Sequence, residues 1–227
     1  MMFLKPFLLI SVLIWNGCVA EKLTPNQIAQ AQHATSILFL HQAPPPFQVL
    51  TERNLIPIQV GLIPELIASI VRGTDTPSSL GARVHAQEKL DDPAIGVQKK
   101  LITRMQERLR VANVRSLDEV QSDIIPDRLS GSITGDLVVA VKTTTWQLMY
   151  YAMDTSFHYL RYRGEVRVLD MAKNDVIWSS ACSYESEEPK NHRHTIAELV
   201  ADNAKFLRIM FDNASESCAK ELMENML

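Results

Sequence analysis

The sequence lacks any apolar run long enough to cross a membrane as a helix. Its longest uncharged N-terminal run, Pro6 to Trp15, has about ten residues, whereas a spanning helix needs about 20. The chain also lacks the G-x-G-x-x-G and P-loop patterns that cradle phosphates, so no nucleotide cofactor is predicted. Neither spanning anchors nor common nucleotide-dependent chemistries are therefore expected.

Signatures of hydrolytic and metal chemistry are missing as well. No H-E-x-x-H pattern occurs, and Gly131-Ser132-Ile133-Thr134-Gly135 is not the G-x-S-x-G elbow, because its third residue is Ile133. The net charge is only −3, which gives no reason to expect nucleic acid or an anionic membrane as a partner. The 46% share of hydrophobic residues is that of an ordinary globular chain.

What the chain does have is a secretory signal at residues 1–20. Lys5 precedes the uncharged run, and small residues follow it, in the order that export signals use. Two cleavage chemistries remain open. A general signal peptidase would cut before Glu21, whereas Gly17-Cys18 resembles the end of a lipobox, in which Cys18 is lipidated and tethers the chain to a membrane surface.

Two cysteines remain beyond the signal, Cys182 and Cys218. In an exported chain, a pair of cysteines predicts one disulfide. The apolar periodicity around both residues makes the pairing plausible, and the closed loop would be worth about 3.5 to 4 kcal/mol. The alternative is two free buried thiols. A cysteine-based metal site would need further ligands at close spacing, so no metal is predicted.

Hydrophobic periodicity outlines the elements. After a flexible polar lead-in at 21–34, a short strand at 36–41 ends at a proline connector, and a short amphipathic helix is expected at 61–73. Asp92-Pro93 predicts the start of a second helix. Alternating residues then predict strands at 136–146, 158–170 and 175–185, with a hairpin loop at 147–158, and a long helix from about Thr195 onward.

These elements predict an α+β fold with a mainly antiparallel sheet, helices packed on one face and a long C-terminal helix. One domain over residues 35–227 is expected. Clean alternation along 158–170 assigns Arg161, Arg163, Glu165 and Arg167 to the opposite face. That face is predicted to be wet or to meet a partner.

Six aromatic residues bracket the expected loop 147–158: Trp146, Tyr150, Tyr151, Phe157, Tyr159 and Tyr162. Trp146, Tyr150 and Tyr151, with the arginines nearby, suit contacts to a glycan, peptide or protein. We take Arg161, Arg163, Arg167 and these three aromatics as a candidate binding surface. The alternative is that the aromatics simply pack in the sheet.

Two histidine groups are the candidates for catalysis. Asp154 and His158 could form an acid–base couple, but a nucleophile would still be needed. His192 and His194, with Glu198, have metal-like spacing without matching a known signature. Neither pattern outweighs an ordinary structural role, so no catalytic residue is assigned.

The signal with Cys18, the early strand ending in PPPF, the segments DLVVAVKTTTW and YRGEVRVLD, and the final helix with its cysteine together resemble uncharacterised bacterial periplasmic or outer-membrane lipoproteins. More remotely, the layout resembles the small envelope-assembly domains of the LpoB and CsgG type. The resemblance implies a non-enzymatic protein, in the periplasm or on the periplasmic face of the outer membrane, that binds another envelope protein. An exported hydrolase and a carrier of a small apolar ligand are the alternatives.

Overall fold

The protein is described by a computed structural model, which covers residues 22–34, 36–50, 77–110, 113–121, 136–186 and 188–227. Three predicted features lie outside the described residues: the signal at 1–20, the helix at 61–73 and the glycine-flanked segment at 131–135. Within the part that is described, no helix is both long and apolar enough to cross a membrane.

A single mixed sheet forms the body of the molecule. Its main path has the order β3-β1-β4-β5-β6, and two short strands add to it, β2 on β4 and β7 on β5. The strands are β1 (Ile37–Gln42), β2 (Gln48–Val49), β3 (Val114–Gln121), β4 (Leu137–Tyr151), β5 (Asp154–Asp170), β6 (Asp175–Glu185) and β7 (His194–Thr195). The pairs β4–β5 and β5–β6 are antiparallel, whereas β1 runs parallel to both β3 and β4.

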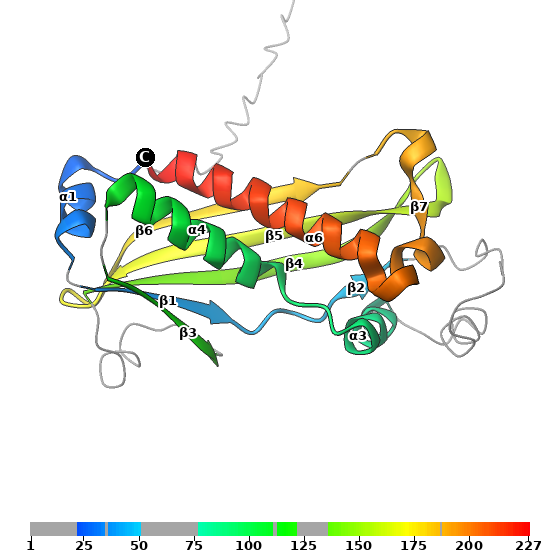
Figure 1. Ribbon diagram of the computed structural model, residues 1–227, viewed down its shortest axis with the longest axis horizontal. Coiled ribbons are helices and arrows are strands. Elements are labelled where there is room, and N and C mark those ends of the chain that lie inside the picture. The colour runs from blue at the N-terminus through cyan, green and yellow to red at the C-terminus, as the bar shows by residue number, and fades with distance from the viewer. Residues whose placement is uncertain (1–21, 35, 51–76, 111–112, 122–135, 187) are drawn as a thin grey trace, which may run out of the picture.

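The helices gather on one face and at the two ends of this sheet. They are α1 (Pro25–His33), α3 (Pro77–Glu88), α4 (Pro93–Leu109) and α6 (Ile196–Met226), with a short 3-10 turn, η1, at Lys190–His192. α4 and α6 pack against each other and against the sheet, while α1 and α3 lie at opposite ends (Figure 1). The predicted α+β class, with a mostly antiparallel sheet and a long C-terminal helix, is confirmed.

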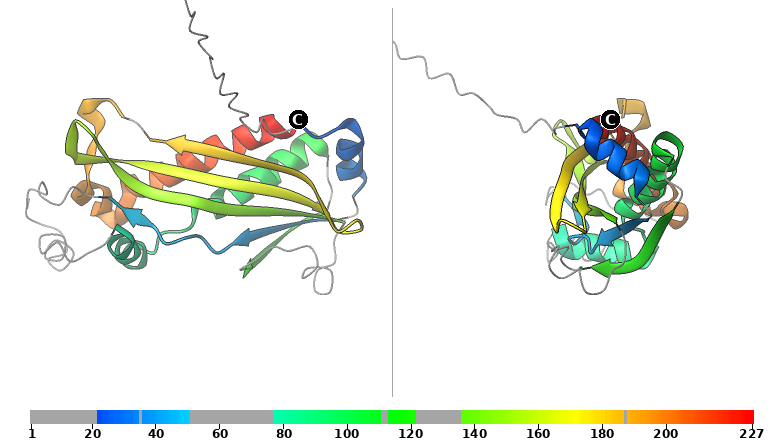
Figure 2. Two further views of the ribbon diagram at one scale, coloured as in Figure 1. Left: turned by 180° about the vertical axis from the view of Figure 1, so that it is seen from behind. Right: turned by 90° about the vertical axis from the view of Figure 1, so that its left-hand side faces the viewer.

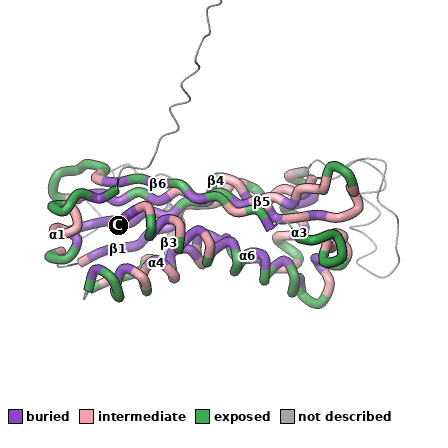
Figure 3. Tube along the Cα trace, turned by 90° about the horizontal axis from the view of Figure 1, so that it is seen from above, coloured by how far each residue is buried: buried purple, intermediate pink, exposed green. Residues whose placement is uncertain are grey.

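The alternation of each strand divides its side chains between two apolar clusters. The larger one fills the space between the sheet and the helices, where Phe39, Trp146, Tyr162, Leu101 and Cys218 are almost fully buried. Viewed from above, the buried residues of the helices face the sheet (Figure 3). A smaller cluster lies on the opposite side of the sheet: Leu38, Leu40, Val138, Ala140 and Leu169.

The N-terminal lead-in is more ordered than its polar composition predicts. Pro25–His33 forms α1, which begins with a capping box. The Thr24 hydroxyl accepts the backbone N–H of Gln27, and the Gln27 side chain accepts the N–H of Thr24. The start of the described chain is also fixed to its end, because the Leu23 N–H donates to the Met226 carbonyl over 3.1 Å.

The expected hairpin loop at 147–158 does not exist as a loop. β4 continues to Tyr151 and β5 begins at Asp154, so only Ala152 and Met153 remain at the tip. The alternation of Trp146 and Leu148 simply carries on past Trp146, because both side chains stay buried on the helix side of the sheet. The polar residues between 147 and 158 interrupt the apolar alternation, and the sequence therefore predicted a loop here.

The helix α6 contains one departure from regular geometry. Thr195 and Glu198 form the capping box at its start. Asp202, Asn203 and Ala204 then have left-handed φ angles of 51°, 58° and 55°, a region that costs residues with a Cβ about 1 to 2 kcal/mol each. The sequence interpretation of one unbroken apolar stripe missed this kink.

The predicted disulfide between Cys182 and Cys218 is confirmed. It joins β6 to α6, with 5.3 Å between the two Cα atoms. Both side chains face the core, as their periodicity predicts. The bond ties the long C-terminal helix to the edge of the sheet.

Candidate interaction surface

The open face of the sheet carries a row of charged side chains along β5. Seen from behind, no described helix covers the strands here (Figure 2). We call Arg161, Arg163, Glu165 and Arg167 the arginine row. Lys142 of β4 stands opposite Glu165, and Glu185 of β6 stands opposite Arg161, so both belong to the same face.

Two ion pairs hold parts of this row in place. The Arg161 Nε lies 2.6 Å from Glu185 Oε1, and the Arg167 Nε lies 2.6 Å from Glu165 Oε1. Arg163 stands exposed between them. The face therefore has four cations, of Lys142 and the three arginines, against two carboxylates, and its local charge is positive in a chain whose net charge is −3.

Small side chains border the row on the side of β6. Ser179, Ala181 and Ser183 stand opposite Arg167, Glu165 and Arg163. These side chains are short, and both Arg163 and Arg167 beside them are exposed. This arrangement suits an acidic or hydrogen-bonding partner.

Trp146 does not belong to this surface, contrary to the sequence hypothesis. Its side chain is 2% exposed and packs against Phe47 and Phe211, and its indole N–H donates to the Pro45 carbonyl over 2.6 Å. Because Trp146 stands opposite Tyr162, it is on the helix side of the sheet. Residue parity along β4 decides this, since Trp146 is in phase with the buried Leu148.

The two tyrosines of the hypothesis separate at the bulge between them. Tyr150 stands opposite His158 on the helix side. The Tyr151 ring instead lies 5.0 Å from that of Tyr159, which is in phase with Arg161 and so extends the arginine row. Tyr151 is held by Arg193, whose guanidinium is 3.8 Å from the ring centroid. Tyr159 is the surface residue that the sequence hypothesis did not select.

The predicted acid–base couple of Asp154 and His158 is not formed. His158 is 4% exposed, and its Nε2 lies 3.0 Å from the Leu50 carbonyl oxygen. Burial lowers the pKa of His158 to about 4, so the imidazole is neutral at physiological pH. Asp154 pairs with Tyr151 at the hairpin tip, and no described hydrogen bond or ion pair joins it to His158.

The other histidine group is occupied by structural contacts. His194 stacks on Phe206 with 4.2 Å between ring centroids. The Glu198 carboxylate accepts the N–H and hydroxyl of Thr195 in the capping box. His192 is exposed in η1. Among the residues described, no group of three or more histidine, cysteine or acidic side chains could hold a metal.

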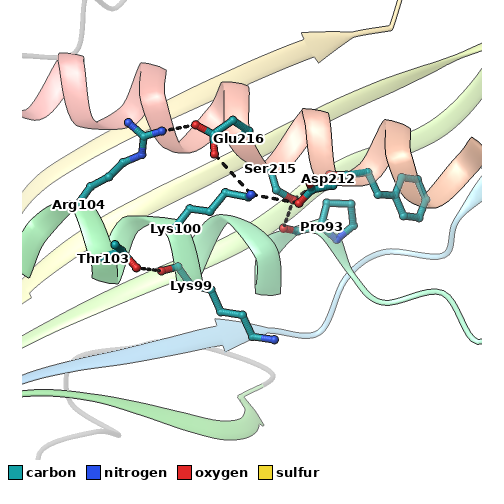
Figure 4. A network of polar contacts seen from close by, with 9 residues as sticks. Pro93, Lys99, Lys100, Thr103, Arg104, Asp212, Ser215 and Glu216 are labelled. Atoms are coloured by element: carbon teal, nitrogen blue, oxygen red, sulfur yellow. Dashed lines mark hydrogen bonds and ion pairs between the residues drawn. The ribbon is translucent and has the colours of Figure 1, made fainter.

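A polar seam joins the two long helices on their outer side (Figure 4). Lys100 Nζ lies 3.0 Å from Asp212 Oδ1 and 3.4 Å from Glu216 Oε2, and Arg104 pairs with the same Glu216. The Asp212 carboxylate, and Glu216 less strongly, raise the pKa of Lys100. These charges largely neutralise each other.

A cavity of about 330 Å³ lies beside this seam, at the start of α4. Its charged lining residues balance in sign: Asp91, Asp92, Lys99, Lys100, Arg208 and Asp212. A small apolar ligand would have to desolvate these groups, which is costly. The cavity thus gives no support to the hypothesis of an apolar-ligand carrier.

A buried polar group fixes the start of α4 to the sheet. The Asp92 carboxylate accepts the Ala94 N–H over 2.9 Å and also the Thr143 hydroxyl. Thr143 lies 3.4 Å from the Tyr162 hydroxyl. Burial raises the pKa of Asp92, against the opposing effect of its two donors, and also raises that of Tyr162. Asp92 was predicted as the N-cap from the sequence, and its link to β4 adds a second structural role.

Comparisons with known proteins give no family assignment. No family model and no curated protein matches the chain. Among solved structures, it is similar to a hypothetical protein from Chlamydia trachomatis, with 12% identity, 84% of this chain and 96% of that chain covered, and a TM-score of 0.35. It is also similar to a Xanthomonas campestris protein of family DUF330, with 11% identity, coverages of 90% and 89%, and a TM-score of 0.39.

A lipoprotein from Neisseria meningitidis is a third similar structure, with 12% identity, 78% of this chain and 95% of that chain covered, and a TM-score of 0.27. At these identities and TM-scores, neither the fold nor the function of the three proteins is carried over to this chain. The resemblance to LpoB- and CsgG-type domains stays a prediction.

Proposed function

We propose that this chain is an exported, non-enzymatic protein of the bacterial cell envelope that binds another envelope protein through the arginine row. The observation that carries the proposal is the excess of cations on a sheet face that no described helix covers. A face of this kind attracts an acidic partner surface and orients it. Arg161 and Arg167 are already held by ion pairs, so little side-chain freedom would be lost on binding.

The disulfide supports the exported state. Structural disulfides persist in oxidising compartments and are rare where glutathione keeps thiols reduced. The buried bond between Cys182 and Cys218 suits a protein that matures in the periplasm after the signal at 1–20 has directed export.

A lipid tether at Cys18 would fix the orientation of the body. Three residues separate Cys18 from Lys22, where the described chain begins, and the four Cα–Cα steps between them span at most about 14 Å. The bond from Leu23 to Met226 fixes this point beside the C-terminus of α6 (Figure 1). The end of the molecule with α1 would therefore face the membrane, with the arginine row presented along the side.

Charge reversal tests the binding surface. The triple variant Arg161→Glu, Arg163→Glu, Arg167→Glu is expected to reduce recovery of the partner from envelope extracts by about tenfold or more, because it converts attraction into repulsion. Raising the ionic strength should weaken the wild-type interaction in the same direction.

The matched control reverses three exposed cations on the helices instead, with Arg108→Glu, Lys205→Glu and Lys220→Glu. Both triple variants change the net charge equally, so a general effect of charge would appear in both. Unchanged recovery with the arginine-row variant, or equal loss with the two variants, would contradict the proposed surface.

A further inference from the structure

The strand β6 forms one edge of the main sheet. For each of its residues, the register shows whether the backbone N–H and C=O groups point toward β5 or away from the sheet. The Leu160 carbonyl accepts the Ser186 N–H, so the even-numbered residues of β5 bond to β6. Their partners across the ladder are Ser180 and Cys182, among others. Because alternate residues of an antiparallel strand face opposite sides, Ser179, Ala181 and Ser183 turn their N–H and C=O groups away from the sheet.

Side chains cap this edge at both ends but not in the middle. The Gln27 amide of α1 donates to the Ile177 carbonyl over 2.9 Å, and Glu221 of α6 accepts the Ser183 N–H over 3.4 Å. Between them, Ser179 and Ala181 are exposed, and no described residue bonds to their outward backbone groups. An open block of two residues is thus framed by two caps.

The edge also lacks the charged residues and prolines that normally prevent two sheet edges from pairing. From Val176 to Tyr184, nine consecutive residues contain neither a charged side chain nor a proline. Natural edges are usually protected by lysines, prolines or a covering element. On the open face, the side chains of Ser179 and Ala181 are also small enough to let another strand approach.

We propose that β6 pairs with β6 of a second copy of this chain, in an antiparallel dimer that continues the sheet. With Ser180 on the two-fold axis, Ser179 of each copy lies opposite Ala181 of the other. This register pairs the outward N–H and C=O groups of Ser179 and Ala181 in about four hydrogen bonds. Ile177 of each copy then lies opposite Ser183 of the other, where the Gln27 and Glu221 caps end the pairing. It brings Asp175 opposite Glu185, whose charge Arg161 offsets.

This self-complementarity favours a second copy over a foreign strand. The caps at Ile177 and Ser183 lie three residues to either side of Ser180, so a two-fold axis through Ser180 places the open block of each copy opposite that of the other, as a two-fold interface requires. The contact is small compared with the roughly 1,600 Å² that a standard interface buries. A weak dimer is therefore expected, which tethering to a shared membrane would favour by raising the local concentration.

Sedimentation equilibrium of the purified protein, between about 10 µM and about 1 mM, tests this inference. The weight-average mass should rise from that of the monomer toward that of the dimer. Over the same range, amide hydrogen exchange at Ser179 and Ala181 should slow, because both N–H groups become bonded.

Two variants test the proposed edge. Ala181→Lys should weaken association by at least about tenfold, since a lysine at the centre of an edge opposes pairing. Its control is Ala86→Lys, which adds the same charge at an exposed position on α3 and should dimerise like the wild type. Ala181→Pro should have the same effect as Ala181→Lys, because the N–H it removes is not used by β5.

Urea unfolding of each variant verifies that the fold is retained. A monomeric mass at every concentration, with both amides exchanging freely, would overturn the dimer. Self-association that survives both Ala181 variants would assign it to another surface. Protection of Ser179 and Ala181 only after addition of envelope extract, in a chain that stays monomeric, would replace the second copy with a foreign strand. None of these outcomes depends on the arginine row, so the proposed function is tested separately.

Discussion

Asp170 is almost fully buried at the turn between β5 and β6, yet it remains charged. Its Oδ1 accepts the N–H groups of Ala172 and Lys173, and its Oδ2 accepts the Gln30 amide and the Lys173 ammonium. Burial alone would raise the pKa of Asp170, but the donors of Lys173 and Gln30 outweigh burial and lower it to about 2. One carboxylate therefore fixes the turn and holds α1 against it.

Removing this charge should make stability depend less on pH. Asp170→Asn is expected to lower the free energy of unfolding by about 1 to 2 kcal/mol at pH 7, because hydrogen bonds to a charged group are lost. The folded pKa of about 2 lies below the ordinary value of 3.8. The stabilisation is therefore complete above pH 3.8 and is lost as the pH falls through about 2, where wild type and variant should converge.

Urea unfolding at a series of pH values measures this convergence. Asp175→Asn is the control, since Asp175 stands opposite Asp170 but is exposed, and its effect should stay within about 0.5 kcal/mol. A difference between wild type and Asp170→Asn that is the same at pH 2 and pH 7 would rule out this role of the charge.

The outcomes at single residues show which features of the structure can be predicted from the sequence. The disulfide of Cys182 with Cys218 and the N-cap at Asp92 follow from local periodicity and known capping preferences, and both were predicted. Trp146 was placed on the surface because aromatics are common in binding sites, although its position in the alternation already puts it in the core. The periodicity of a strand is thus a stronger guide to burial than residue type.

At the scale of elements, α4 and α6 meet at a close approach of Gly96 to Ser215. A Cβ added at Gly96 would lie 2.5 Å from the Ser215 Oγ and 2.9 Å from its Cβ. The Ser215 hydroxyl in turn lies 3.0 Å from the Pro93 carbonyl oxygen and 2.8 Å from that of Phe211. The small residue at 96 therefore sets the distance between the helices.

Gly96→Ala should destabilise the protein, although alanine is normally the better helix residue by about 1 kcal/mol. We expect a loss of about 1 to 3 kcal/mol in the free energy of unfolding, because the methyl group overpacks the contact. Adding Ser215→Gly to the variant removes the obstructing side chain. A double-mutant cycle by urea unfolding should then give a combined loss smaller than the sum of the two single losses. Additive losses would show that the contact is not tight.

Elements whose contacts are local in sequence could be predicted, whereas the pairing of distant segments could not. The β5–β6 hairpin and the C-terminal helix depend on neighbouring residues, and the sequence predicted both. The placement of β1 between β3 and β4 was not predicted, because it joins segments far apart in the chain and leaves no local pattern. The arginine row was predictable from alternation, whereas its Tyr159 extension depends on where β5 begins.

At the scale of the whole molecule, the long hairpin separates two ends. β5 has 17 residues, which corresponds to about 55 Å of strand. One end has the turn at Lys173 and α1, and the other has the hairpin tip, where Met153 is 98% exposed (Figure 1). The molecule is thus long enough for its two ends to be distinguished by their distance from a membrane.

A fluorescence experiment can test the orientation implied by a tether at Cys18. Donor dyes on Lys173→Cys and on Met153→Cys should behave differently in vesicles that contain acceptor-labelled lipid. Transfer from position 173 should be strong, and transfer from position 153 much weaker, because the tip lies about 55 Å away along β5.

Mass spectrometry of the mature N-terminus comes first, since it distinguishes a diacylglyceryl Cys18 from a free Glu21. The same measurement verifies that the Cys182–Cys218 bond is intact in both labelled variants. Equal transfer from the two positions in a lipidated protein would contradict the proposed orientation.

The parallel pairing of β1 has a consequence for biogenesis. Ile37 pairs with Val114 on one side and with Leu137 on the other. Under the proposed export with the N-terminus first, Leu38, Phe39 and Leu40 would emerge long before either neighbouring strand. Until then these side chains are exposed and can cause aggregation. Holdase chaperones should therefore bind the chain at this segment. The sheet should form only late in translocation.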